Sequence, residues 1–240
     1  MIDALRAKYP GVQMILECEA PRKYLWQDYG YPIVTTTPNY IDIKPTPSCP
    51  KDYLFFNMWF GVFNDILCTY GLSHINHVHT FNRQMMYYKL NSFLDLPTGP
   101  PVLKLRDLGL NVPPNTVLVE NGPCSSGQCN NSINTILSQL IKNFPNLNFL
   151  LSYDIGLKDQ NVVSGWGHNL LQLSDLSNKC IGFITQASGV NAASYTAANI
   201  GKPRVFFGWN YIYKIWDNSA DVAYNYDQLK LWIEGKICKR

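Results

Sequence analysis

The run from Gly182 to Gly208 constrains the fold more than any other part of the chain. It contains a short apolar strand at 182–185, a Ser-Gly turn, a helix of small residues at 191–200 and a second apolar strand at 204–208. Two strands joined by one helix are typical of a parallel sheet with a crossover connection. A turn of this kind, at the carboxyl end of a parallel strand, is where nucleotides and phosphates bind.

The residues before and after this run continue the same alternation. Strands are predicted at 117–120 and 148–153, and helices at 131–143, 170–176 and 227–234. Four strands that alternate with helices predict a doubly wound, parallel α/β domain.

The amino-terminal half also alternates, less regularly. Its predicted elements are helices at 2–9, 24–29, 60–70 and 81–94, and strands at 12–17, 33–36 and 53–58. Residues 96–114 are rich in proline and glycine, which interrupt regular structure, so this segment is the predicted linker. We therefore expect two domains, at 1–105 and 106–240.

Composition excludes several classes of protein. With 46% hydrophobic and 15% charged residues, the chain is neither disordered nor a coiled coil. A net charge of +3 without a basic run argues against a nucleic-acid partner. The seven cysteines lack CxxC spacing, which indicates free thiols in a reducing compartment. No signal peptide and no apolar run of about 18 residues is present, so we expect a cytoplasmic protein without a membrane span.

The loop after the first strand of the carboxyl half is the first candidate site. The spacing of Gly122 and Gly127 copies a phosphate-binding loop, but Gln128 and Cys129 replace its lysine and its Ser or Thr, which argues against a P-loop NTPase. Phosphate binding by backbone N–H groups and by Ser125 or Ser126 remains open. The alternative is a plain strand-to-helix turn.

The second candidate is the loop after the strand at 182–185. Gly189 permits close backbone approach, and Ser188 can bind a phosphate or cap the helix. Both loops should open at the same edge of the sheet. His168, in the loop after 148–153, is a further candidate beside Trp166, which can stack on a ring or pack in the loop. The predicted ligand-binding residues are Gly122, Ser125, Ser126, Gly127, Gln128, Gln186, Ser188, Gly189, Asn191 and His168.

These residues resemble the carboxyl half of GT-B glycosyltransferases, in particular the ADP-heptose:lipopolysaccharide heptosyltransferases (glycosyltransferase family 9). The likeness lies in Ser188-Gly189 with the alanine-rich helix, Gly201-Lys202-Pro203 and the strand that ends at Phe207-Gly208. Residues 170–176 and 3–16 are similar to two further segments of that family. The resemblance is specific at 181–208 and loose elsewhere.

The resemblance implies two Rossmann-like domains that face each other across a cleft. It also implies transfer of a hexosyl, heptosyl or deoxyhexosyl group from a nucleotide diphosphate sugar to a glycan hydroxyl. The transfer would be metal-independent and inverting, with no cofactor besides the donor substrate. The carboxyl domain would bind the donor, and the amino domain an oligosaccharide or glycolipid acceptor.

The chain departs from the family pattern at the catalytic base. The family has a strand and a Gly-Asp turn before the first helix, and that turn supplies the base; this sequence begins at the helix. Either the sequence is part of a longer polypeptide, or the base lies elsewhere. Glu17 and Glu19, at the carboxyl end of the first strand, are the predicted catalytic residues. Their alternative role is that of ordinary loop carboxylates.

Other functions stay open. Ala187 occupies the place of an acidic residue in the family, which favours a non-catalytic nucleotide-sugar or glycan-binding module of a larger glycan-synthesis protein. Epimerases and pyruvyl transferases share the fold. The histidines of the run at 74–79 could bind a metal, act in the cleft or lie in a loop, but the run lacks neighbouring acidic or cysteine ligands.

Overall fold

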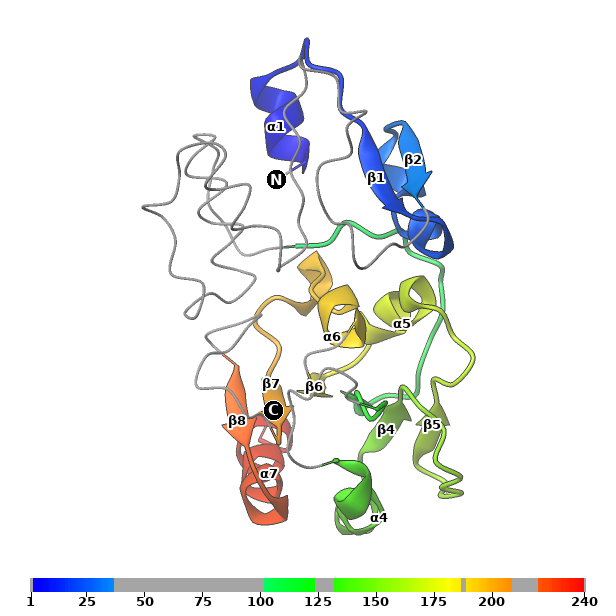
Figure 1. The fold of residues 1–240 in the computed structure, drawn as a ribbon. Coiled ribbons are helices and arrows are strands. Elements are labelled where there is room, and N and C mark those ends of the chain that lie inside the picture. Colours follow the sequence, from blue (N-terminus) through cyan, green and yellow to red (C-terminus); the bar gives the residue numbers. More distant parts are fainter. Residues whose placement is uncertain (1, 37–101, 124–131, 187–188, 209–219, 240) are drawn as a thin grey trace. The chain divides into compact units, whose positions relative to one another are not determined.

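The computed structural model describes residues 2–36, 102–123, 132–186, 189–208 and 220–239. The chain divides into two compact units, Met1–Pro100 and Pro101–Arg240 (Figure 1). The elements predicted at 53–58, 60–70 and 81–94 lie outside the described residues.

The first unit contains a helix followed by two parallel strands. Its elements are α1 (Ile2–Lys8), β1 (Leu16–Glu19), η1 (Ala20–Leu25), η2 (Gln27–Tyr29) and β2 (Ile33–Thr36). Strand β1 pairs with β2 from Leu16↔Ile33 to Glu19↔Thr36. The strand expected at 12–17 starts four residues later, because the chain turns after α1 through a hydrogen bond from the Val12 N–H to the Tyr9 carbonyl.

The second unit is an α/β domain built on a six-stranded parallel sheet. The strand order is β5-β4-β3-β6-β7-β8, and every neighbouring pair is parallel. This is the doubly wound order in which the chain first builds one side of the sheet and then the other. The strands are β3 (Thr116–Val119), β4 (Asn148–Leu151), β5 (Val162–Ser164), β6 (Gly182–Thr185), β7 (Arg204–Phe207) and β8 (Asp221–Ala223).

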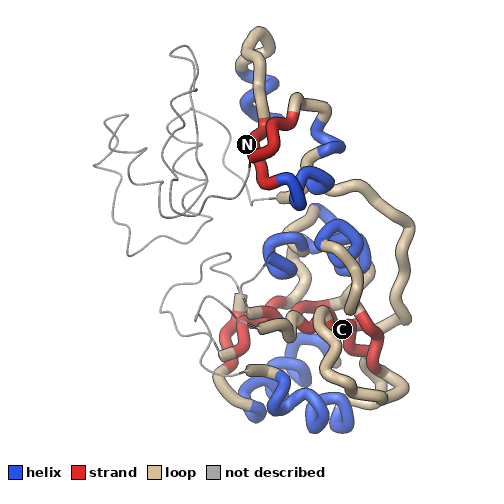
Figure 2. Tube along the Cα trace, turned by 45° about the vertical axis from the view of Figure 1, so that its right-hand side comes forward, coloured by secondary structure: helices blue, strands red, loops and turns tan. Residues whose placement is uncertain are grey.

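Helices cover both faces of this sheet (Figure 2). They are α4 (Asn134–Asn143), α5 (Leu170–Ser177), α6 (Gly189–Ala193), the 3-10 turn η5 (Ala197–Asn199), α7 (Tyr226–Trp232) and the π-helical turn η6 (Ile233–Ile237). Side chains alternate between the two faces along each strand. Val117 and Val119 of β3 pack with α4, α7 and η6, whereas Leu118 packs with the residues that end α5. Burial of each such side chain stabilises the fold by about 1.5–3 kcal/mol.

The helix expected at 191–200 is shorter than its sequence predicts. Helix α6 ends at Ala193, and η5 follows after a break. At the break, the Tyr195 carbonyl accepts a hydrogen bond from the Leu103 N–H at 2.7 Å, and Leu103 forms a parallel bridge with Thr196. Tertiary pairing thus overrides the helical preference of the alanine-rich segment.

The described part of the predicted linker packs against the second unit. The Leu110 N–H donates to Oδ2 of the buried Asp175 on α5 at 2.8 Å, and Leu110 and Val112 contact the core. Leu103, Leu110 and Val112 therefore attach this segment to the second unit. Within the described ranges, no helix has the length and apolar character needed to cross a membrane.

Candidate functional site

The direction of winding reverses between β3 and β6. After β3 the chain continues to β4 on one side, and after β6 it continues to β7 on the other. In open parallel sheets, ligands bind outside the carboxyl ends of the strands at such a point. Strands β3 and β6 pair directly, with Val119 beside Ile184, so the loops after both strands lie at one edge of the sheet.

Glu120 connects these two loops. Its side chain is 2% exposed, and Oε2 accepts a hydrogen bond from the Gln186 N–H at 2.7 Å. Oε1 accepts a longer bond, 3.4 Å, from the Asn191 N–H in α6. Backbone N–H groups at the start of a helix are the donors that bind anions. Here a carboxyl group of the chain itself engages the N–H of Asn191 in α6 and that of Gln186 directly after β6.

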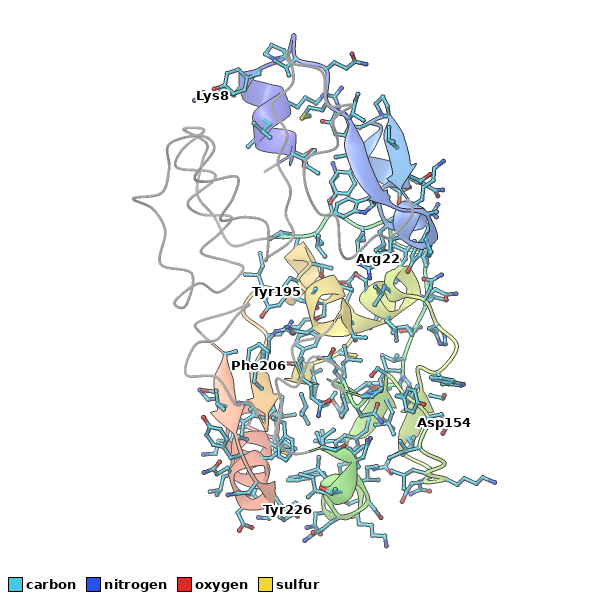
Figure 3. The ribbon with its side chains drawn as sticks, in the orientation of Figure 1. Lys8, Arg22, Asp154, Tyr195, Phe206 and Tyr226 are labelled. Carbon is cyan, nitrogen blue, oxygen red and sulfur yellow. The ribbon has the colours of Figure 1, made fainter. Side chains whose placement is uncertain are left out.

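Arg204 on β7 lies beneath the same turn and is 5% exposed. Its Nη1 donates to Asn191 Oδ1 at 2.6 Å and to Ser194 Oγ at 2.9 Å. The guanidinium carbon lies 4.2 Å from the ring centroid of Phe183 and 4.3 Å from that of Tyr195, which follows α6 (Figure 3). Cation–π contacts and charge-assisted bonds compensate the buried charge.

Asn191 therefore joins the buried side chains of Glu120 and Arg204. Its backbone N–H faces Glu120, and its side-chain oxygen faces Arg204. The residue is fully buried, and its Nδ2 has no hydrogen-bond partner among the described residues, although buried amides are normally satisfied. Asn191 and Gln186, both predicted from the sequence to bind a ligand, thus form part of a buried network at the edge of the sheet.

Asn121 fixes the ends of β3 and β4 relative to each other. Its Oδ1 accepts from the Tyr153 N–H at 2.8 Å, and its Nδ2 donates to the Tyr153 carbonyl at 2.9 Å. Nδ2 also donates to Asn134 Oδ1, and Asn134 Nδ2 donates back to the Asn121 carbonyl, at 3.1 and 3.0 Å. The fully buried Asn121 therefore locks two strands and the start of α4 together.

An exposed aromatic pair follows β4 and β5. The rings of Tyr153 and Trp166 meet edge to face, with centroids 4.6 Å apart and an interplanar angle of 78°. Their exposed fractions are 38% and 55%. Asp154, the neighbour of Tyr153, marks this place in Figure 3. Because Asn121 holds the Tyr153 backbone, the pair forms an ordered aromatic surface that could stack on a planar base or a sugar ring.

His168 lies two residues beyond Trp166. Its backbone N–H donates to the Gly165 carbonyl at 3.2 Å, and its side-chain Nδ1 is buried without a hydrogen-bond partner in the described part of the chain. The next residue, Asn169, caps α5 through a capping box with Gln172. The cap fixes the loop that carries Trp166 and His168.

The remaining predicted residues fall into three groups. Gly122 follows Asn121 and is half-buried, and Gly189 is exposed at the start of α6. Among the described residues, a Cβ atom at Gly189 would meet the methyl groups of Leu170 at 3.6 Å, which is ordinary van der Waals contact. Ser125, Ser126, Gly127, Gln128 and Ser188 lie outside the described residues. The backbones of Glu17 and Glu19 belong to β1 in the first unit, but their side chains are not described.

Lys202, part of the motif at 201–203, has a structural role. Its Nζ donates to the Asn178 carbonyl and to Asn199 Oδ1, both at 2.9 Å. Burial lowers the pKa of Lys202. The lysine thus joins the end of α5 to the turn before β7.

Among the described residues, no cluster of three or more His, Cys, Asp or Glu could hold a metal ion. His74, His77 and His79 lie outside those residues.

Sequence reasoning missed Glu120, Asn121 and Tyr153. Their positions along the chain could have identified them. Glu120 and Asn121 directly follow β3, and Tyr153 lies two residues after the end of β4. A polar residue at the carboxyl end of a buried parallel strand lies at the edge of the sheet where ligands bind.

Comparison with solved structures finds a distant likeness. No protein-family model matches the chain, and no curated protein matches it. A solved structure described as "Crystal Structure Analysis of the Glycotransferase of kitacinnamycin" superimposes with a TM-score of 0.43 at 14% identity. The match covers 98% of this chain and 70% of that chain.

Proposed function

We propose that this chain binds a nucleotide diphosphate sugar at the carboxyl edge of the six-stranded sheet and transfers its sugar to a glycan hydroxyl. The observation that carries the proposal is the meeting of three features at this edge. They are the loop after β3, the turn after β6 and the Tyr153–Trp166 pair. Doubly wound sheets bind nucleotides at this position.

Each part of the donor would bind at one of these features. The nucleobase would stack on the Tyr153–Trp166 surface, with His168 close by. The diphosphate would contact the loop that begins at Gly122 and contains Ser125, Ser126, Gly127 and Gln128, and the turn of Gln186, Ser188, Gly189 and Asn191. Because the Glu120 side chain already engages the N–H groups of Gln186 and Asn191, we place the phosphate nearer the loop after β3.

The proposal also covers the stabilisation of the leaving group, the catalytic base, the stereochemistry and the acceptor. Backbone N–H groups and side chains would stabilise the leaving diphosphate without a metal ion. Glu17 or Glu19 would accept the proton of the acceptor hydroxyl, and the transfer would invert the anomeric carbon. The two units would form a GT-B pair of the heptosyltransferase type, with an oligosaccharide or glycolipid acceptor on the first unit.

The test is a release assay. The chain is incubated with UDP-, GDP-, ADP- and TDP-sugars, each with and without oligosaccharide and glycolipid acceptors, and free nucleoside diphosphate is measured. We expect acceptor-dependent release with one donor, unchanged by a chelator and reduced in Trp166→Ala. Absence of release with every donor would refute the transferase proposal.

A second candidate is a nucleotide-sugar-binding module without catalysis. The observation that favours it is the occupation of the Gln186 and Asn191 N–H groups by Glu120, which leaves fewer donors to stabilise a leaving diphosphate. Binding of a nucleotide sugar without turnover, with every acceptor, would identify this role.

A further inference from the structure

A pocket lies on the sheet face covered by α4 and α7, at the carboxyl ends of β7 and β8. This pocket of about 400 Å³ lies between the starts of the two helices, beside the ends of β7 and β8. Tyr226, the first residue of α7, is labelled in Figure 3. The lining residues that matter for its chemistry are Phe207, Tyr224, Tyr226, Ser132, Thr135 and Asn225. Its volume falls within the range of small-molecule sites.

The described lining combines aromatic rings with neutral polar groups. Phe207 is buried at the end of β7, whereas Tyr224 is 52% exposed. The polar groups are the hydroxyls of Ser132, Thr135, Tyr224 and Tyr226 and the amide of Asn225, and none of the described lining residues is charged. An anion would therefore find no cation among the described lining residues, and a purely apolar ligand would leave the polar groups unmatched. A neutral ligand with one apolar face and several hydroxyls fits this lining.

The polar groups have hydrogen-bonding capacity left for a ligand. Asn225 uses its Oδ1 to accept from the Gln228 N–H at 3.0 Å, and in the described part of the chain its two Nδ2 protons are not used. Ser132 Oγ accepts from the Asn134 N–H at 3.3 Å, which leaves its own proton to donate. Thr135 donates to the Ser132 carbonyl at 2.9 Å and retains its oxygen as an acceptor.

The pocket is also ordered before any ligand arrives. Asn225 is held as the cap of α7, and the Tyr224 N–H donates to Gln228 Oε1 at 2.8 Å. The Tyr226 hydroxyl accepts a hydrogen bond from Asn143 at the end of α4. Side chains that are fixed in advance lose less entropy when a ligand binds.

We propose that this pocket binds a neutral pyranose ring. The Tyr224 ring packs against the apolar face of the sugar, the Asn225 amide and the Ser132 hydroxyl donate to its hydroxyl oxygens, and Thr135 accepts. The inference does not depend on the proposed function, because the pocket can hold a sugar whether or not the chain transfers one.

The test measures binding of methyl glucopyranoside, methyl galactopyranoside and methyl mannopyranoside to the full chain by saturation-transfer NMR and titration. Tyr224→Ala removes the ring. Asn225→Asp keeps a capping oxygen but removes the two donors. Leu231→Ala, a residue on α7 that is 66% exposed and does not line the pocket, is the matched control.

We expect at least one glycoside to bind the wild-type chain and Leu231→Ala equally. Tyr224→Ala and Asn225→Asp should each weaken binding about tenfold, or 1.4 kcal/mol. Absence of binding by all three glycosides, equal binding by Tyr224→Ala, or competition by inorganic phosphate would overturn the inference. Nucleotide binding by Trp166→Ala, measured in parallel, tests the proposed function separately.

Discussion

The Oε2 atom of Glu120 lies 2.7 Å from the backbone nitrogen of Gln186, so the residue after β3 bonds directly to the residue after β6. The bond spans the point where the winding of the sheet reverses. A buried carboxylate therefore sets the geometry of the edge at which we propose that the donor binds.

Replacing Glu120 should destabilise the second unit. Glu120→Gln keeps the shape but turns an amide donor toward one of the two backbone N–H groups, which then loses its acceptor. We expect a loss of about 1–3 kcal/mol in the free energy of unfolding, measured by urea denaturation. Glu234→Gln, on the exposed Lys230–Glu234 pair, is the control and should change little. Equal effects of the two substitutions would contradict the role assigned to Glu120.

Asn121 should tolerate neither alanine nor aspartate. Alanine leaves the Tyr153 N–H and carbonyl without their partner, and aspartate buries a charge and loses the donor. We expect Asn121→Ala to cost about 1–3 kcal/mol, and Asn121→Asp to cost more. Asn146→Ala, at an exposed turn, provides the comparison in thermal unfolding. Unfolding temperatures of both Asn121 variants within error of Asn146→Ala would show that the network is dispensable.

Gly165 should be sterically required. A Cβ atom there would lie 2.7 Å from the Leu151 carbonyl oxygen and 3.0 Å from Leu173 Cδ2, so the backbone of β4 or β5 must move. We expect Gly165→Ala to cost about 1–3 kcal/mol. Gly235→Ala meets no atom within 4 Å and should unfold at or above the wild-type temperature. The idea fails if the two alanine variants unfold at the same temperature.

Cys180 should resist alkylation in the folded protein. Burial raises the pKa of its thiol to about 12, against a weaker opposing effect of Lys202. The reactive thiolate forms only as the pH approaches that value, so at pH 8 it is about one ten-thousandth of the thiol. Iodoacetamide labelling, resolved by mass spectrometry of peptides, should modify the exposed Cys238 well before Cys180. Similar native labelling rates would contradict this, and labelling in denaturant controls for peptide detection.

The central strands of the second unit could be predicted from sequence because they are continuous apolar runs. Predictions at 117–120, 148–153, 182–185 and 204–208 correspond to β3, β4, β6 and β7. Strands β5 and β8 were missed because each has three residues and is only partly buried. The early end of α6 depends on pairing between Leu103 and the segment at 195–196, a contact between distant residues that no local pattern encodes.

The sequence predicts at which edge of the sheet the candidate site lies, but not the side-chain contacts within it. Alternation of strands and helices places the loops after β3 and β6 at one edge, but not the direction of the Glu120 side chain. Asn191 was predicted to bind a ligand at the start of a helix, and the structure adds that it is fully buried and accepts a hydrogen bond from Arg204. The Tyr153–Trp166 contact requires β4 and β5 to be neighbours, and β5 was not predicted.

The central claim is that a nucleoside diphosphate binds beside Tyr153 and Trp166 at the carboxyl edge. Titration calorimetry of UDP, GDP, ADP and TDP against the wild-type chain, Trp166→Ala and the control Leu231→Ala tests it most directly. The account predicts that one nucleotide binds the wild type and the control alike, and that Trp166→Ala weakens its binding about tenfold, or 1.4 kcal/mol. Absence of binding by all four nucleotides, or equal binding by Trp166→Ala, would contradict it.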